Sequence, residues 1–286
     1  MKKARKFELD SDVMAHYESG VEKDRLLKDT ELLEFHRTKQ IISRYLPKKP
    51  ATILDIGGGP GVYASWLGEM GHVVHLVDPM PLHLTQARQQ MKQTGISVAS
   101  ISLGDARALE FPNEYADIVL MMGPLYHLTE KGQRQTALME GLRVLKQDGL
   151  IFVAGISKFA SALDGSRGGY LRDPDFMRII QRDLKEGQHR NPGKHPRYFT
   201  TAYFHHPAQL AEEVREGGFH DVTIFAVEGF AWLLPDFEKL WSDNESRDRL
   251  LSLIEATETE PSLIGVSAHL LCVGQKKQSQ RRPEKL

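Results

Sequence analysis

Thr52-Ile53-Leu54-Asp55-Ile56-Gly57-Gly58-Gly59-Pro60-Gly61 is the stretch that decides the fold. A short apolar run ends in an aspartate, a cluster of glycines follows, and the sequence VYASWL at 62–67 begins a helical apolar pattern. This order predicts a strand, a tight turn and a helix, which together make the first half of a βαβ unit. Glycines in the turn can adopt positive φ and leave room for a ligand beside the backbone. The first amides of the helix point at whatever lies on the turn.

The spacing of the glycines indicates which ligand the turn takes. A dinucleotide fingerprint reads G-x-G-x-x-G, but here Val62 or Tyr63 stands where the third glycine would be. The pattern D-x-G-x-G-x-G instead resembles motif I of the class I S-adenosylmethionine (SAM) methyltransferases. The alternative is a tight turn that binds no ligand. The resemblance implies that SAM is the cofactor and that the motif residues bind it, namely Asp55, Gly57, Gly58, Gly59 and Gly61.

Length and composition are those of a soluble globular protein. The 286 residues suffice for one large α/β domain with a cap, and 41% hydrophobic with 26% charged residues is ordinary for a globular protein. A net charge of −1 weighs against nucleic acid or an anionic membrane as partner. The single cysteine, Cys272, excludes an internal disulfide, and no Cys/His spacing predicts a metal site. Neither a secretory signal nor a membrane-spanning run is present, so we expect a cytoplasmic protein.

Seven apolar runs rich in β-branched residues alternate with helical patterns along the chain. Such alternation predicts an α/β fold with a parallel sheet that is buried on both faces. The family resemblance implies a doubly wound, seven-stranded, mostly parallel Rossmann-like sheet of order 3-2-1-4-5-7-6, in which the last strand is antiparallel. The expected strands are 52–56, 72–78, 97–103, 116–122, 150–156, 221–227 and 267–274.

The remaining segments divide the chain around this core. We expect a SAM-binding core at 51–156 and a C-terminal part of the core at 207–274, which carries a helical insertion at 229–264 with one helix over 235–258. Residues 157–206 read as a cap insertion with one helix near 174–186, and 275–286 as a disordered tail. Residues 1–50 are helical from about 8 to 46. They form either a helical pair that packs on the sheet or a lid, and we predict the lid, with Tyr17 and Arg25 facing the cofactor.

Two further acidic positions match the family pattern. Asp78 ends the second strand, where a carboxylate can accept hydrogen bonds from both ribose hydroxyls of the cofactor. The resemblance puts Pro79 and Met80 against the adenine ring. It also implies that Asp105 accepts a hydrogen bond from the adenine amine and that the backbone amide of Ala106 donates to a ring nitrogen.

The acceptor is expected above the end of the fourth strand, because ligands of open α/β sheets bind where the strand order reverses. Residues 123–126 (Gly-Pro-Leu-Tyr) occupy the place of the [Asn/Asp]-Pro-Pro-[Tyr/Phe] motif of nucleobase amino-methyltransferases, but glycine lacks the amide that holds the target amine. His127 is the candidate general base. The alternative, which explains this position nearly as well, is a partly exposed loop histidine without a catalytic role. Met122 is assigned to the cofactor, and the acceptor pocket is assigned Tyr126, His127, Tyr198, Tyr203 and His205.

The function that these motifs favour is methyl transfer from SAM to an oxygen or nitrogen atom of a small molecule. An RNA or protein methyltransferase is the alternative within the enzyme class, and a SAM-binding protein without catalysis is the alternative outside it. The glycine spacing disfavours an NAD-dependent oxidoreductase. The sequence does not name the acceptor or the oligomeric state. A basic face would support the macromolecular alternative, and its residues would be Arg167, Arg172, Arg178, Arg182 and Lys185.

Overall fold

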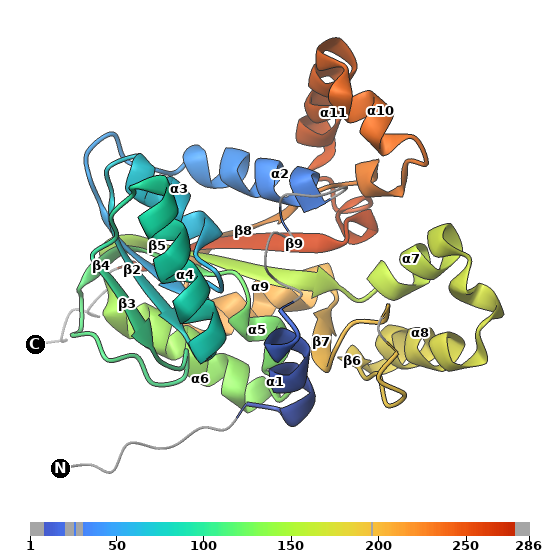
Figure 1. The fold of residues 1–286 in the computed structure, drawn as a ribbon, viewed down its shortest axis with the longest axis horizontal. Coiled ribbons are helices and arrows are strands. Elements are labelled where there is room, and N and C mark those ends of the chain that lie inside the picture. Colours follow the sequence, from blue (N-terminus) through green and yellow to red (C-terminus); the bar gives the residue numbers. More distant parts are fainter. Residues whose placement is uncertain (1–8, 21–25, 27–30, 196, 278–286) are drawn as a thin grey trace, which may run out of the picture.

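The computed structural model describes residues 9–20, 26, 31–195 and 197–277. Within them a central twisted sheet carries helices on both faces (Figure 1). Arg25, which was expected in the lid, lies outside the described residues, as does most of the predicted tail. No helix of the described part is long and apolar enough to cross a membrane.

The main sheet has the predicted topology. Its strands lie in the order β3-β2-β1-β4-β5-β9-β8, which is the expected 3-2-1-4-5-7-6. The first five are parallel, and β9 runs antiparallel to both β5 and β8. The strands are β1 (Thr52–Ile56), β2 (Val73–Asp78), β3 (Ser100–Leu103), β4 (Ala116–Met121), β5 (Leu145–Ser157), β8 (His220–Ala226) and β9 (His269–Gln275).

Apolar residues bury both faces of this sheet. Along β5, Phe152 packs into one hydrophobic cluster, while its neighbours Ile151 and Val153 pack into the other, as alternation along a strand requires. The first cluster lies under α2 (Glu31–Ser43), α3 (Val62–Glu69) and α4 (Pro81–Thr94), and the second under α6 (Lys131–Val144) and α9 (Pro207–Glu216). Helix α6 ends at Val144 and β5 begins at once at Leu145, so this strand is longer than the expected 150–156.

The two N-terminal helices have different roles, which corrects the lid prediction. Ile41 and Ile42 of α2 are fully buried in the core, and Arg37 of the same helix donates from Nε to the carbonyl oxygen of Val227 at 3.2 Å. Arg37 also pairs with Glu258. Helix α2 is therefore part of the sheet packing. Helix α1 (Ser11–Glu18) lies at the end of the sheet where the strands' carboxyl ends lie, beside α5 (Pro124–His127) and β7 (Ala202–His205) (Figure 1).

The cap at 157–206 contains more structure than the single predicted helix. It holds α7 (Ala160–Gly168), η2 (Tyr170–Arg172), α8 (Pro174–Glu186), β6 (Gln188–His189) and β7 (Ala202–His205). β7 pairs with the last residues of β5, Ile156 with Phe204 and Ser157 with His205. The partner register of β4 with β5 ends earlier, where Met121 lies opposite Val153. β7 therefore continues the sheet beyond the end of β4 and holds the cap there.

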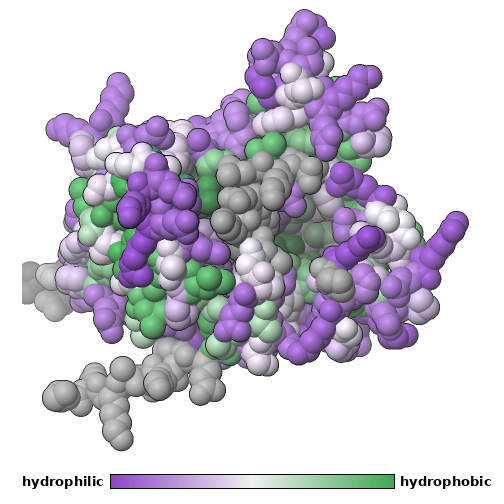
Figure 2. Space-filling view, in the orientation of Figure 1, coloured by the Kyte–Doolittle hydropathy of each residue, from purple (hydrophilic) through white to green (hydrophobic). Residues whose placement is uncertain are grey.

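The second insertion contains two helices where one was predicted. α10 (Phe237–Ser242) and α11 (Asn244–Thr257) are separated at Asp243, whose carboxylate accepts from the backbone N–H of Ser246 at 2.8 Å. An aspartate in this position starts a new helix as its N-cap. Two short turns complete the insertion, η3 (Ala231–Leu233) and η4 (Ile264–Val266). The outer surfaces of the α7–α8 and α10–α11 regions are mostly hydrophilic (Figure 2).

Candidate functional site

The glycine turn has the tight geometry that its sequence predicts. Gly57 and Gly59 have positive φ of 70° and 55°. The N–H of Gly57 donates to the carbonyl oxygen of Val77 at 2.7 Å, and that of Gly59 to Oδ2 of Asp78 at 2.8 Å. A Cβ on Gly57 would lie 2.7 Å from Cδ of Pro124, so the loop after β4 closes directly onto the turn. Only glycine allows both the backbone conformation and this approach.

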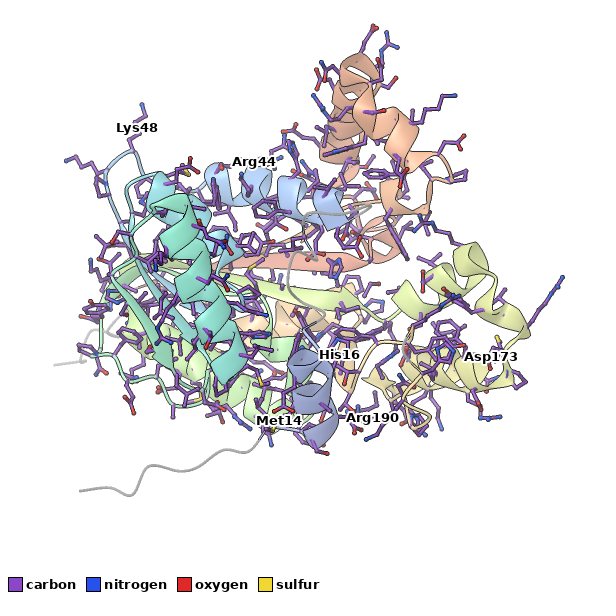
Figure 3. The ribbon with its side chains drawn as sticks, in the orientation of Figure 1. Met14, His16, Arg44, Lys48, Asp173 and Arg190 are labelled. Atoms are coloured by element: carbon purple, nitrogen blue, oxygen red, sulfur yellow. The ribbon has the colours of Figure 1, made fainter. Side chains whose placement is uncertain are left out.

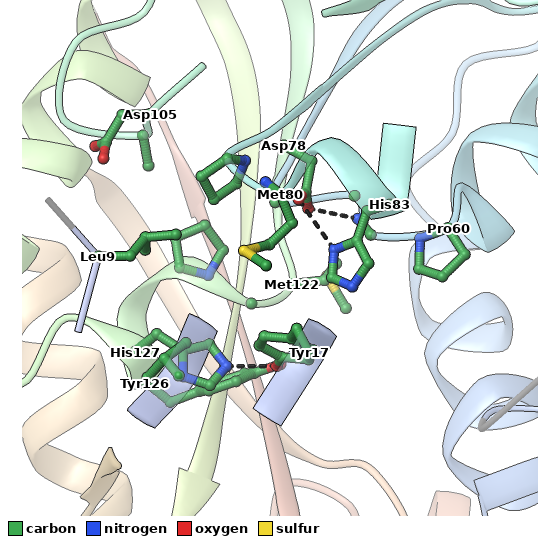
Figure 4. Close-up of a pocket in the computed structure, with 18 of the residues that line it drawn as sticks. Leu9, Tyr17, Pro60, Asp78, Met80, His83, Asp105, Met122, Tyr126 and His127 are labelled. Carbon is green, nitrogen blue, oxygen red and sulfur yellow. Dashed lines mark hydrogen bonds and ion pairs between the residues drawn. The ribbon is translucent and has the colours of Figure 1, made fainter. Parts of the chain in front are cut away.

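A cavity lies above the turn, at the carboxyl ends of β1, β2 and β4 (Figure 4). Its position is the point of strand-order reversal at which ligands of this architecture bind. Most of the residues predicted to contact cofactor or acceptor line it. They are Tyr17, Gly57, Gly58, Gly59, Asp78, Pro79, Met80, Asp105, Ala106, Met122, Tyr126 and His127.

Two motif residues do not line the cavity, which corrects their predicted contact with the cofactor. Asp55 is fully buried beneath the turn, and a Cβ on Gly58 would lie 2.6 Å from its Oδ2. Desolvation, and then the charge of Asp78, raises the pKa of Asp55 to about 7, while the nearby amide of Ala64 lowers it in part. Gly61 caps α3 with a φ of 88° and faces the core. Both residues shape the turn from below.

Asp78 is a carboxylate of the cavity with three hydrogen-bond partners. Oδ2 accepts from Gly59, while Oδ1 accepts from the N–H of Met80 at 2.8 Å and lies 3.0 Å from Nδ1 of His83 (Figure 4). A carboxylate has about four acceptor positions, so one remains for a ligand hydroxyl on Oδ2. The sequence reasoning did not identify His83, which lies on the first turn of α4 and also lines the cavity.

Asp105 is held rigidly by its own loop. Arg107 donates to Oδ1 from Nε and from its backbone N–H, both at 2.8 Å, and to Oδ2 from Nη2 at 2.6 Å. The guanidinium is almost completely buried, and it fixes the plane of the carboxylate. Asp105 therefore presents a preoriented acceptor at the rim of the cavity, beside Ala106.

Tyr17 brings α1 into the site. Its hydroxyl lies 2.5 Å from Nε2 of His127, and its ring meets the ring of His83 edge-on with centroids 5.0 Å apart (Figure 4). Burial lowers the pKa of His127 to about 3, and the charges of His16 and His83 act in the same direction. His127 is thus neutral near pH 7 and a weak base. Its geometry fits the cavity, but its basicity does not fit the predicted role as proton acceptor.

A second cavity of about 300 Å³ adjoins the first and shares Tyr17 and Tyr126 with it. Tyr198 lines this cavity, as predicted for the acceptor side. The other lining residues come mainly from the cap and from the ends of β5 and β9. They are Glu31, Ile156, Ala160, Ser161, Asp164, Phe176, His189, Arg197, Phe199, Phe204, Trp232, Ala268 and His269.

The predicted acceptor contacts of Tyr203 and His205 are wrong. His205 is fully buried, with Nε2 3.4 Å from Oε2 of Glu213, and the hydroxyl of Tyr203 accepts from Nε2 of Gln209 at 2.6 Å. Successive side chains of a strand point to opposite faces. Phe204 therefore faces the second cavity, and its two neighbours on β7 face away from it.

A buried ion pair explains where His205 points. Arg134 donates to Glu213 from Nε at 2.7 Å and from Nη2 at 2.8 Å, and its guanidinium lies 3.8 Å from the ring centroid of Tyr203. These hydrogen bonds and the adjacent His205 lower the pKa of Glu213 to about 2. Such a network holds α6 against α9 and β7.

Within the described residues, one group of three side chains could hold a metal ion, although none was predicted. Glu34, Glu228 and His269 have ligand atoms within 4.8 Å of one another. Glu228 is already engaged, since Oε2 accepts from Oγ of Ser267 at 2.7 Å and from the N–H of His269 at 3.0 Å. Its Oε1 lies 2.5 Å from Nδ1 of His269. This arrangement is a complete hydrogen-bond network that ties β9 to the segment after β8.

Comparisons with known proteins converge on one kind of enzyme. A family profile described as a methyltransferase domain matches residues 53–149. The ubiquinone/menaquinone biosynthesis C-methyltransferase UbiE of Neisseria meningitidis serogroup A is 31% identical over 183 residues, which are 61% of this chain and 69% of that protein.

Solved structures with the same fold are more distant in sequence. A SAM-dependent methyltransferase of Methanosarcina mazei has a TM-score of 0.56 at 16% identity, covering 84% of this chain and 98% of its own. A phosphoethanolamine N-methyltransferase 2 of Haemonchus contortus, solved with phosphomonomethylethanolamine and S-adenosylhomocysteine, has a TM-score of 0.54 at 19% identity. It covers 85% of this chain and 53% of its own. At these sequence identities, the structural similarity supports a shared fold and nothing beyond it.

Proposed function

This chain belongs to the class I SAM-dependent methyltransferases, and we propose that it methylates a small molecule held in the second cavity. The observation that carries the proposal is the junction of the two cavities at Tyr17 and Tyr126. A cofactor above the glycine turn and an acceptor beneath the cap would meet there. The second cavity has the size of a small-molecule site, and seven aromatic, three aliphatic and six polar or charged residues line it.

The first cavity has polar groups that suit SAM. We assign the ribose to the remaining acceptor position on Asp78, the adenine to Met80 and to Asp105 with the amide of Ala106, and the methionine part to the glycine turn. Bound SAM supplies an electrophilic methyl group on a sulfonium sulfur, which keeps the electron pair of the bond that breaks. The chain contributes alignment, an effect of up to roughly 7–11 kcal/mol.

The acceptor atom is part of the proposal. Polar side chains in the second cavity, among them Glu31, Asp164 and Arg197, suit an acceptor with polar groups, and we propose an oxygen or nitrogen atom as the target. The relatives from Neisseria are named C-methyltransferases, which makes a carbon atom the specific alternative. The carbon chemical shift of the transferred methyl group separates these three products.

A macromolecular acceptor has less support. The five basic residues of the cap that would favour it are exposed, but Arg178 pairs with Asp175 and Lys185 lies 3.6 Å from Glu186. Such pairs are typical of a solvated helix surface. The net charge of −1 adds no attraction to nucleic acid. We retain a cytoplasmic, small-molecule enzyme as the proposal.

The test uses SAM labelled in its methyl group. Purified protein is incubated with the ultrafiltered small-molecule fraction of a cell extract, and in parallel with the protein and RNA fractions. We expect label in a small organic product. Label confined to protein or RNA would overturn the proposed acceptor class, and label in none of the fractions would overturn the proposed function.

A further inference from the structure

The second cavity contains a histidine whose role the sequence does not reveal. Resting on the proposed function, we propose that His189, held by Asp183, is the group that takes the proton from the methyl acceptor. His189 is the last residue of β6, and Asp183 lies in the last turns of α8. The base predicted from the sequence, His127, lies on the cofactor side of the junction.

Asp183 and His189 form a buried, oriented pair. Nδ1 of His189 lies 2.8 Å from Oδ2 of Asp183, and the two side chains are 2% and 0% exposed. Ser161 of α7 donates from Oγ to the same oxygen at 2.5 Å. Gly187 has a φ of 70°, which reverses the chain after α8 so that His189 returns to the helix it has just left. A Cβ on Gly187 would lie 2.4 Å from the carbonyl oxygen of Phe204, so the turn requires glycine.

The pairing fixes the tautomer of His189. An ionised carboxylate only accepts hydrogen bonds, so Nδ1 carries the ring proton and Nε2 presents a lone pair. Nε2 is buried and makes no hydrogen bond to any residue that the structure describes. The ring lines the second cavity and stacks on Phe204, with centroids 4.5 Å apart and an interplanar angle of 14°. A buried acceptor without a partner costs free energy unless a ligand satisfies it.

The two histidines differ in their charged neighbours. The carboxylate of Asp183 compensates the charge of an imidazolium at His189, as the aspartate does in serine-protease triads. Other charges lie further out: Arg190 donates to the carbonyl oxygen of His189 at 2.7 Å and lies near the start of α1 (Figure 3). Asp164 and Arg197 line the same cavity. Among the residues that the structure describes, no carboxylate is bonded to His127, and burial lowers its pKa to about 3.

Phe199 connects the pair to the junction between the cavities. Its ring centroid lies 6.2 Å from that of His189, 5.9 Å from that of His127 and 6.5 Å from that of Tyr126. An acceptor packed against Phe199 can therefore face His189 while it extends toward the junction at Tyr126. The acceptor group gives its proton to Nε2 and uses the electron pair of the broken bond to hydrogen, or its lone pair, to bind the methyl carbon. The proton leaves to solvent after the product does.

The experiment compares two buried histidines that each have a carboxylate partner. His189→Gln removes the proposed base, and His205→Gln removes a fully buried histidine beside Glu213 that lines neither cavity. Labelled SAM and the small-molecule fraction serve as probes. We expect kcat of H189Q to fall by a factor of about 10²–10⁴. The kcat of H205Q should stay within about threefold of the wild-type value, because His205 does not contact the acceptor. SAM affinity, measured by calorimetry, should stay within about twofold in both variants.

A second measurement reads the ring protons directly and does not depend on turnover. With ¹⁵N-labelled histidine, we expect the ring of His189 to carry a protonated Nδ1 and a bare Nε2, and the shift of its Nδ1 proton signal in Asp183→Asn identifies it. Asp183 is a positioning residue, so D183N should also displace the pH dependence of kcat.

The possible outcomes separate the two proposals. A protonated Nε2 on His189, or wild-type transfer rates in H189Q, would overturn this inference alone. If the wild-type protein labels no small molecule, the proposed function fails, whatever tautomer the spectrum reports.

Discussion

Asp55 and Asp78 lie at the carboxyl ends of neighbouring strands, yet their carboxylates differ in hydrogen bonding and in access to the cavity. Asp78 receives two backbone N–H bonds and contacts His83, and its one remaining acceptor position can serve a ligand. Asp55 is fully buried, and its oxygens make no hydrogen bond by geometry within the described part of the chain. At the scale of single residues, the same side chain therefore offers an acceptor position to a ligand in one place and supports the turn in the other.

This contrast predicts a pH-dependent effect of Asp55→Asn on stability. The pKa of Asp55 is about 7 in the folded protein and 3.8 as its ordinary value. Between these values the folded state binds more protons than the unfolded chain, so the wild-type free energy of unfolding falls as pH rises. Below about pH 4 both states are protonated, and above about pH 7 both are ionised. The full loss is on the order of 4 kcal/mol.

Urea unfolding of wild type and D55N from pH 4 to 8 tests this. The asparagine cannot ionise, so the free energy of unfolding of D55N minus that of wild type should rise with pH and level off above about pH 7. The fixed cost of a buried amide is the same at every pH and cancels from this trend. A difference that stays constant from pH 4 to 8 would contradict a raised pKa.

At the scale of elements, the strands were predictable and the orientation of the cap was not. Each strand of the main sheet is a local apolar run, so its existence and order follow from neighbouring residues and the family pattern. The contacts of Tyr203 and His205 depend on the register of β7, and a register error of one residue moves every side chain to the other face. His189 was missed because its meaning depends on Asp183 and on the turn at Gly187. No local sequence signal encodes that pairing.

The packing of the two N-terminal helices also could not be predicted from their local sequence pattern, and it leads to a testable prediction. Both are amphipathic, but only α1 lines the first cavity, where Tyr17 lies 2.5 Å from His127. A ligand in the first cavity should therefore slow hydrogen exchange of the backbone amides of α1, because opening of this helix takes Tyr17 out of the cavity. Exchange in α2 should not change, because Ile41 and Ile42 already pack in the core. Mass spectrometry with and without S-adenosylhomocysteine measures both helices in one experiment. Equal protection of α1 and α2, or of neither, would rule out α1 as a lid.

At the scale of the whole molecule, the first cavity is built from elements that lie far apart in the sequence. Its walls come from α1, the glycine turn, the ends of β2 and β4, and the loop at Asp105. A ligand that bridges these elements binds the folded state and not the unfolded chain, so it raises the free energy of unfolding by mass action. The two cores on opposite faces of the sheet then unfold at a higher denaturant concentration.

This coupling predicts how stability depends on the ligand. S-adenosylhomocysteine at about 100 times its Kd should raise the free energy of unfolding by about 2.7 kcal/mol, whereas NAD at the same concentration should not change it. Asp78→Ala removes a charged acceptor and should weaken binding by about 1–3 kcal/mol, so the stabilisation at that concentration should fall to about 0.3–1.8 kcal/mol. Asp117→Ala is the matched control, because Asp117 accepts from Thr52 at 2.8 Å and from Lys146 at the opposite end of the sheet. D117A should lower stability without changing the increment that the ligand adds. Stabilisation by NAD, or equal increments in wild type and D78A, would refute the assignment of the cavity to SAM.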